Sequence, residues 1–186
     1  MEELDESRLM TYSAWMRRYR RLVGLPFLIA ALLLAHFSER YLYPGLALIL
    51  FGELLRIWAA GHLKKEEILT TGGPYRFIRN PLYFGSLLIG LGFFLISASY
   101  WILLLIALYF VVSYIPVIRY EEEILKNKFP GAFEEYSKNV PTFFPTVHPW
   151  KSPSTQFSWQ QVWENKEYNA ILGIAIVILL LALFRR

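Results

Sequence analysis

Long uncharged stretches alternate with short charged segments along the chain. Residues 22–37, 81–118 and 168–184 carry no Asp, Glu, Lys or Arg, and residues 42–62 carry only two charged side chains. A bilayer hydrocarbon core about 30 Å thick needs roughly 20 apolar helical residues. The runs 22–37, 42–62 and 168–184 therefore each predict one membrane-crossing helix, the last of them just long enough to span.

The uncharged run 81–118 is twice as long as the others. A helix of that length measures about 57 Å, close to two bilayer crossings, at a rise of 1.5 Å per residue. We expect a helical hairpin whose turn is Ser97 to Tyr100, SASY. The pattern predicts an all-α, polytopic membrane helix bundle of about five transmembrane helices.

The basic residues orient these helices, because cytoplasmic loops are enriched in Lys and Arg. With the N-terminus inside, the polar segments 61–80 and 119–167 both face the cytoplasm, whereas the terminal Arg pair argues mildly against a full fifth crossing. The cytoplasmic basic residues are then Arg8, Arg17, Arg18, Arg20, Arg21, Lys64, Lys65, Arg76, Arg79, Arg119, Lys126, Lys128, Lys138, Lys151 and Lys166, and the outer ones are Arg40, Arg185 and Arg186.

One domain with four parts follows from this pattern. Residues 1–21 form a charged interfacial segment, and without a clear cleavage site they do not resemble a signal peptide. Four transmembrane helices occupy 22–118, a cytoplasmic segment occupies 119–167, and a C-terminal transmembrane helix occupies 168–186.

Composition narrows the chemistry. The chain is 55% hydrophobic with 18% charged residues, which is typical of a multi-pass integral membrane protein. It has no cysteine, which excludes disulfides and thiolate catalysis, and its three scattered histidines argue against a metal site. The net charge of +4 does not indicate nucleic-acid binding, because the basic residues flank apolar segments.

The Asn80-Pro81 pair has the chemistry of a helix start, where Asn caps free N–H groups and Pro suits the first position. The amino end of that helix suits a carboxylate or phosphate, although the pair also suits a plain helix start. Further along, Gly90 and Gly92 would admit a ligand or pack helices.

Three consecutive glutamates follow Arg119 at the end of the hairpin. Glu121 and Glu122 could hold an ammonium group and ribose hydroxyls, with Arg119 as a donor to a substrate, or the run could be a solvated helix start. Tyr75 and Tyr83 could face a sulfonium through their rings or simply lie at the membrane interface. Glu53 and Arg56, three residues apart, either pair structurally or line a substrate tunnel.

Together these segments resemble the isoprenylcysteine carboxyl methyltransferase family and the related phospholipid N-methyltransferases. The resemblance covers residues 56–145 and follows the family's order of a T-G-P-Y-like turn, R-[HN]-P-x-Y, G-x-G, E-E-x-x-L-x-x-x-F and V-P…P. The segments are LTTGGPYRFIRNPLYFG, GLG and EEEILKNKFPGAFEEYSKNVPTFFP.

The resemblance implies an integral membrane methyltransferase with a cytoplasmic cofactor-binding cap. S-adenosylmethionine (SAM) enters from the cytosol, and a lipophilic acceptor, such as the carboxylate of an isoprenylcysteine, enters from the bilayer. Arg119 and Glu122 are the catalytic candidates, and no metal is expected. The implied cofactor residues are Ile68, Leu69, Thr70, Tyr75, Asn80, Pro81, Leu82, Tyr83, Gly90, Gly92, Glu121 and Glu122.

Three departures from the family pattern bear on the site. Asn80 stands where the family often has His, so proton transfer is ruled out there. An extra glycine, Gly72 or Gly73, shifts the alignment of the loop. Val117 stands where the carboxyl methyltransferases have an arginine, with Arg119 the nearest substitute.

Three alternative functions stay open at this point. They are a phospholipid N-methyltransferase, an NADPH-dependent reductase of the sterol type, and a non-catalytic membrane scaffold. The short chain and the paired glutamates favour methyl transfer over reduction. Binding of SAM rather than NADPH would separate the enzyme classes.

Overall fold

The computed structural model describes residues 2–34, 37–64, 68–151 and 155–183, and these ranges contain helices and no strand. Arg185, Arg186, Lys65 and the side chains of Arg8, Arg17, Arg18, Arg20 and Arg21 lie outside the described part. The helices are α1 (Glu2–Leu34), α2 (Leu42–His62), α3 (Pro81–Ser97), α4 (Tyr100–Tyr109), α5 (Ile115–Lys128), α6 (Ala132–Asn139), α7 (Trp159–Glu164) and α8 (Tyr168–Leu183).

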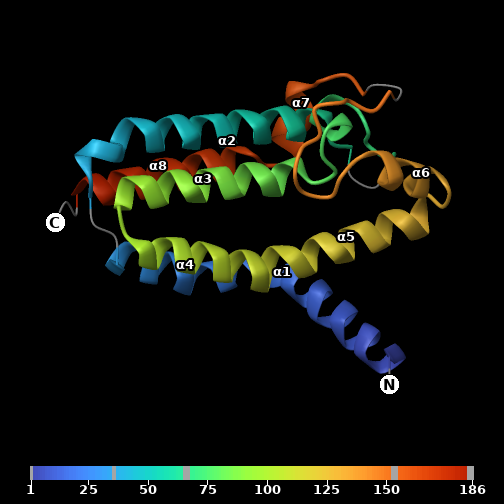
Figure 1. Ribbon diagram of the computed structural model, residues 1–186, viewed down its shortest axis with the longest axis horizontal. Helices are drawn as coiled ribbons and strands as arrows, with labels where there is room; N and C mark the ends of the chain where they lie inside the picture. The colour runs from blue at the N-terminus through green and yellow to red at the C-terminus, as the bar shows by residue number, and fades with distance from the viewer. Residues whose placement is uncertain (1, 35–36, 65–67, 152–154, 184–186) are drawn as a thin grey trace.

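The helices form an elongated bundle with the loops gathered at one end. In Figure 1, α2 and α3 run together above the continuous line of α4 and α5, and the amino-terminal turns of α1 project away from the bundle. The short helices α6 and α7 and the long connections lie at the end where α2 finishes and α3 begins. The fold is therefore a membrane-type helical bundle with an irregular cap, as the hydrophobic pattern predicts.

Two helical stretches are long and apolar enough to cross a bilayer. They are Glu39–His62, which contains α2, and Tyr100–Lys128, which runs from the start of α4 to the end of α5. The other apolar helical stretches are shorter, at Leu22–Ala31, Pro81–Ser97 and Tyr168–Leu181. The predicted hairpin turn is confirmed. Helix α3 ends at Ser97, Ala98 adopts the left-handed conformation with φ of 46°, and α4 begins at Tyr100.

The sequence-based division at residues 21 and 118 does not coincide with helix ends. Helix α1 runs without interruption from the charged segment into the first apolar run. Helix α4 continues through a π-helical turn, Phe110–Tyr114, into α5. The paired glutamates therefore lie on a rigid extension of a membrane helix, because regular backbone hydrogen bonding does not stop where the side chains become charged.

Glycines bring α2 and α3 into close contact. A Cβ atom on Gly92 would lie 2.6 Å from the carbonyl oxygen of Gly45, and a Cβ on Gly52 would lie 2.7 Å from that of Gly85. Only glycine fits at such separations, as in small-residue packing of membrane helices. This contact fixes α3, and with it Asn80 and Tyr83, relative to the end of α2.

Candidate active site

The two polar segments pack against each other at the capped end of the bundle. Arg79 N–H donates to Pro141 O at 2.9 Å, Thr146 N–H to Phe77 O at 2.9 Å, and Trp150 N–H to Arg76 O at 3.0 Å. The Tyr136 hydroxyl donates to the carbonyl of Tyr75 at 2.8 Å. The two polar segments therefore contact each other, as expected if both lie on the same side of the membrane.

Asn80 stands at the start of α3 but does not cap it with its side chain. Pro81 takes the first helical position, as predicted. The Asn80 Nδ2 instead donates to Glu122 Oε1 at 3.0 Å and to Thr142 O at 3.1 Å. The expected side-chain cap is therefore wrong, because the amide group is turned toward α5 and the following loop.

Arg79 is the centre of this contact and was expected only to orient the chain. Its guanidinium binds Glu122 through two bonds, Nε to Oε1 at 2.9 Å and Nη2 to Oε2 at 3.2 Å. It also donates to Ser137 O at 2.9 Å and to the Thr142 hydroxyl. The charge of Glu122 is thus matched within the protein, which the R-N-P motif alone did not signal.

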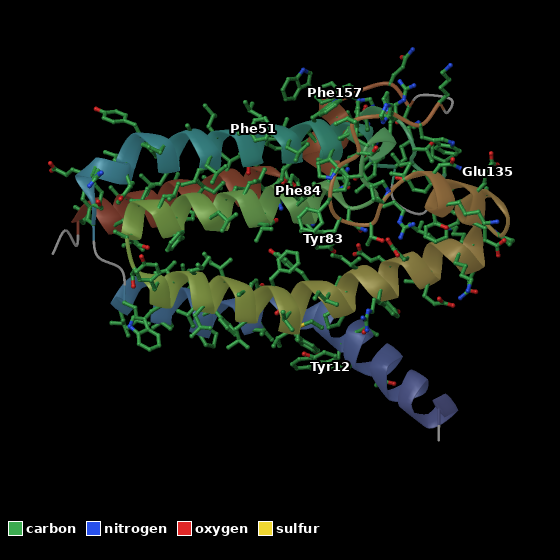
Figure 2. All side chains as sticks on the ribbon, viewed as in Figure 1. Tyr12, Phe51, Tyr83, Phe84, Glu135 and Phe157 are labelled. Carbon is green, nitrogen blue, oxygen red and sulfur yellow. The ribbon has the colours of Figure 1, made fainter. Side chains whose placement is uncertain are left out.

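Glu121 has a different environment from its neighbour. The hydroxyl of Tyr83, which extends from α3 toward α5 in Figure 2, donates to Glu121 Oε2 at 3.0 Å. Tyr83 is 8% exposed and packs with Met16, Val117 and Ile118. Adjacent glutamates therefore have distinct partners, an arginine for Glu122 and a phenol for Glu121.

These groups line a cavity of about 720 Å³. Its walls come from the end of α2, the start of α3, α5, α6 and the start of α8. Ten of the residues proposed from sequence line it, namely Ile68, Leu69, Thr70, Tyr75, Asn80, Pro81, Leu82, Tyr83, Glu121 and Glu122. The structure brings them together although they come from two segments far apart in sequence.

Three predicted site residues, Gly90, Gly92 and Arg119, do not line this cavity. Gly92 packs on Gly45 of α2, and a Cβ on Gly90 would lie 3.3 Å from Ile106 of α4. Arg119 is exposed and is not part of the cavity wall. Val117, at the position where the family places an arginine, is fully buried in the apolar cluster under Tyr83. The predicted cofactor roles of Gly90 and Gly92 and the predicted catalytic role of Arg119 stay predictions.

The cavity also has polar residues that sequence reasoning did not bring together. Arg56 of α2 forms an ion pair with Glu167, which precedes α8. Its Nη1 donates to the Ser86 hydroxyl and to Leu82 O at 3.3 Å. The expected pair with Glu53 is present at 3.7 Å, as the longer of the two ion pairs. Because Arg56 and Glu167 are far apart in sequence, their contact becomes visible only once the position of α8 is known.

Two tyrosines of the cap are held in the neutral form. Burial raises the pKa of Tyr75 well above its usual range, with neighbouring phenols and carboxylates adding to the effect. Burial also raises the pKa of Tyr136, although the Arg79 guanidinium acts in the opposite direction. Both hydroxyls therefore remain donors over the physiological pH range.

Comparison with known proteins points to one family. Residues 41–132 match the family model described as phospholipid methyltransferase. The chain is 30% identical over 167 residues to the cobalt-zinc-cadmium resistance protein CzcN of Cupriavidus metallidurans, covering 84% of this chain and 77% of the relative. It is also 30% identical over 147 residues to the nickel-cobalt-cadmium resistance protein NccN of Alcaligenes xylosoxydans xylosoxydans, covering 76% of this chain and 68% of that one.

A more distant relative is named as an enzyme. The protein-S-isoprenylcysteine O-methyltransferase of Schizosaccharomyces pombe is 28% identical over 101 residues, which cover 54% of this chain and 43% of the yeast protein. No solved structure matches the chain. The matched family segment contains the start of α3 and the glutamates of α5, but not the segment that supplies Glu167.

Proposed function

We propose that this chain, which belongs to the phospholipid methyltransferase family, is a multi-pass membrane enzyme that transfers a methyl group from SAM to a lipophilic acceptor. The observation that carries the proposal is the meeting of Tyr75, Asn80, Tyr83 and Glu121 in one cavity. These residues come from both halves of the family motif. We place the cavity on the cytoplasmic face, in keeping with the distribution of basic residues.

The residues of the cavity fit SAM. A volume of about 720 Å³ lies within the range of small-molecule sites, roughly 300 to 1,000 Å³. Glu121, which accepts a hydrogen bond from the Tyr83 hydroxyl, would hold the ammonium group. Backbone N–H groups at the amino end of α3 would hold the carboxylate. The rings of Tyr75 and Tyr83 would face the sulfonium.

The protein's part in the reaction is to position and shield the reactants. SAM, when bound, supplies the methyl group, and the leaving group of the transfer is a neutral thioether. Tyr83 and Glu121 fix one side of the site through their hydrogen bond. Arg79 holds Glu122 and so keeps α5 against the start of α3. Placing the acceptor in line with the methyl group, away from water, would supply most of the rate enhancement.

The acceptor is expected to be lipophilic because the cavity adjoins apolar helices. The carboxylate of an isoprenylcysteine, the expectation from sequence, stays a prediction together with the prenylated partner that it implies. Two of the relatives are named for metal resistance. Among the described residues of this chain, no group of three His, Cys, Asp or Glu side chains could hold a metal ion.

Ligand binding tests the proposal and separates it from its rivals. Protein purified into lipid nanodiscs would be titrated with SAM, S-adenosylhomocysteine and NADPH by calorimetry. Saturable binding of the first two, with none of NADPH, is the expected result. Binding of NADPH alone would indicate a reductase, and binding of none of the three would leave the non-catalytic scaffold as the better interpretation.

A further inference from the structure

Helix α7 exposes two tryptophans on one side. Trp159 is 71% exposed and Trp163 is 70% exposed. Residues four apart lie about 40° apart around a helix, so the two indoles form a single outward stripe. Tryptophan side chains are highly buried on average, because each carries a large apolar ring. We therefore expect this stripe to be covered in the protein's natural environment.

The last turn of α2 fixes the position of α7. The Asn165 Nδ2, just after α7, donates to Ala60 O and to Leu63 O, both at 2.9 Å. The Ser158 N–H, just before α7, donates to Gly61 O at 2.9 Å. In Figure 1, α7 lies beside the end of α2, and the apolar helix α8 begins four residues after α7. Helix α7 is therefore held at the level where a membrane-crossing helix ends.

The side of α2 that leads toward α7 is apolar and exposed. Phe51, Leu54 and Trp58 are exposed and lie three and four residues apart, which places them on one side of this membrane-crossing helix. In a bilayer such a side faces the lipid acyl chains. Lipid is therefore the neighbour of α2 along the side that Trp58 ends.

A series of ring contacts continues this side onto α7. The ring centroids are 6.4 Å apart for Trp58 and His62, 6.0 Å for His62 and Phe157, and 5.1 Å for Phe157 and Trp159. At the other end of α7, the Trp163 ring lies 4.8 Å from that of Tyr168, the first residue of α8. The indole stripe is thus continuous with the lipid-facing surface of the membrane helices and is not an isolated patch.

The polar residues of α7 lie beside the indoles. Gln160 and Glu164 are also exposed, and the Gln160 Nε2 donates to Glu164 Oε1 at 2.8 Å. They lie about 100° around the helix from the tryptophans. The exposed lysines Lys64 and Lys166 follow α2 and α7 respectively, and lysines at such positions reach lipid headgroups. Indoles next to amides and charges are typical of the membrane–water interface.

The size of the stripe argues against a protein partner. Two aromatic side chains bury roughly 150 to 250 Å² each. A stable protein interface buries roughly 800 Å² per partner. A second copy of this chain or a soluble protein would therefore need much more surface than α7 offers.

We propose that α7 lies in the headgroup layer of the leaflet beside the cap, with Trp159 and Trp163 inserted among the lipids, and that it anchors the cap to the bilayer surface. The three residues that follow α7, at 165–167, line the cavity. The anchor therefore holds this part of the cavity wall at headgroup level. This inference concerns the placement of the cap and does not depend on methyl transfer.

Spin labels measure the depth of α7, because the chain has no cysteine and one can be introduced at a time. The variants are Trp159→Cys, Trp163→Cys, Gln160→Cys and Glu164→Cys, with Glu134→Cys on the exposed side of α6 as the control. Each full-length protein would be placed in nanodiscs of phosphatidylcholine and phosphatidylglycerol. Collisions of the label with oxygen, which concentrates in the bilayer, are compared with collisions with a water-soluble nickel complex.

We expect oxygen collisions to dominate at positions 159 and 163, with the labels roughly 5 to 10 Å into the headgroup–acyl boundary. Nickel collisions should dominate at positions 160 and 164 and at the control. Nickel collisions at 159 and 163 equal to those at the control would overturn the proposal. Spin–spin broadening between two copies would also overturn it, because α7 would then be a dimer contact.

A second measurement avoids labels at the tryptophan positions. The fluorescence of the parent minus that of the double variant Trp159→Phe, Trp163→Phe gives the emission of the two indoles. Lipids brominated near the start of the acyl chains should quench this difference, whereas aqueous iodide should not. The reverse result would overturn the proposal even if a cysteine variant folds poorly, which thermal melting against the parent would reveal.

Discussion

Asn80 and Glu122 are joined by a hydrogen bond of 3.0 Å between Nδ2 and Oε1, across 42 residues of sequence. The same Glu122 Oε1 accepts from Arg79 Nε at 2.9 Å. The start of α3 is therefore fastened to α5 by two consecutive side chains acting on one carboxylate. The paired glutamates were expected to share a role, but this arrangement gives Glu122 partners within the protein. Substitution of Glu121 and substitution of Glu122 are therefore expected to have different effects.

Glu121→Gln is expected to weaken SAM binding by roughly ten- to a hundredfold, because a neutral amide replaces the charge facing the ammonium group. Its melting temperature should stay near that of the parent, since the amide oxygen can still accept from the Tyr83 hydroxyl. Calorimetric titration and thermal melting measure the two effects. Glu123→Gln, whose residue contacts Asn127 on the same helix, is the matched control and should bind SAM as the parent does. Equal affinities for both variants would contradict the assignment of Glu121.

Arg79→Ala is expected to reduce the free energy of unfolding by more than it reduces the free energy of SAM binding. The substitution leaves the partly buried Glu122 without its bidentate partner, which should cost about 2 to 4 kcal/mol of unfolding free energy. A double-mutant cycle with Glu122→Gln tests the cause, because the double variant should lose less than the sum of the single variants. Additive losses would show that the ion pair does not hold α3 to α5.

Gly52→Ala is expected to destabilise the bundle, because the new Cβ would lie 2.7 Å from the carbonyl oxygen of Gly85. Separating α2 from α3 to relieve this contact also moves the cavity wall, so SAM affinity should fall with stability. Gly173→Ala in α8 is the control, since a Cβ there meets nothing within 4 Å. We expect this control to melt at or above the temperature of the parent. Similar melting of both variants would contradict the tight α2–α3 contact.

Tyr75 and Tyr136 should not make the free energy of unfolding depend on pH near neutrality. In strong alkali they should make it fall. Both pKa values are raised by burial. Their contribution is fully present below the unfolded-state pKa of about 10 and is lost as pH rises above it, because the unfolded chain then releases these protons. Melting temperatures from pH 8 to 11 measure the effect. Tyr136→Phe should melt lower at pH 8, since the Tyr75 carbonyl loses its donor, and should show a shallower alkaline decline.

Much of the fold follows from local features of the chain. The lengths of the uncharged runs predict the helices, the SASY segment predicts the turn at Ala98, and Pro81 predicts the first residue of α3, because each depends only on hydrophobic periodicity or backbone chemistry. The motif residues likewise indicate which two segments meet. What they did not indicate was the continuity of α4 into α5, since side-chain charge does not mark the end of a helix.

The tertiary structure decided the pairings. The sequence determined that Asn80, Glu121 and Glu122 belong together, but only packing assigned Glu122 to Arg79 and Glu121 to Tyr83. It also placed Gly92 against Gly45 and Glu167 beside Arg56. Such contacts join residues from different helices, and their distances depend on how helix surfaces fit together. Periodicity fixes which face of a helix is apolar, whereas the partner of a single buried charge is set by the three-dimensional position of every helix around it.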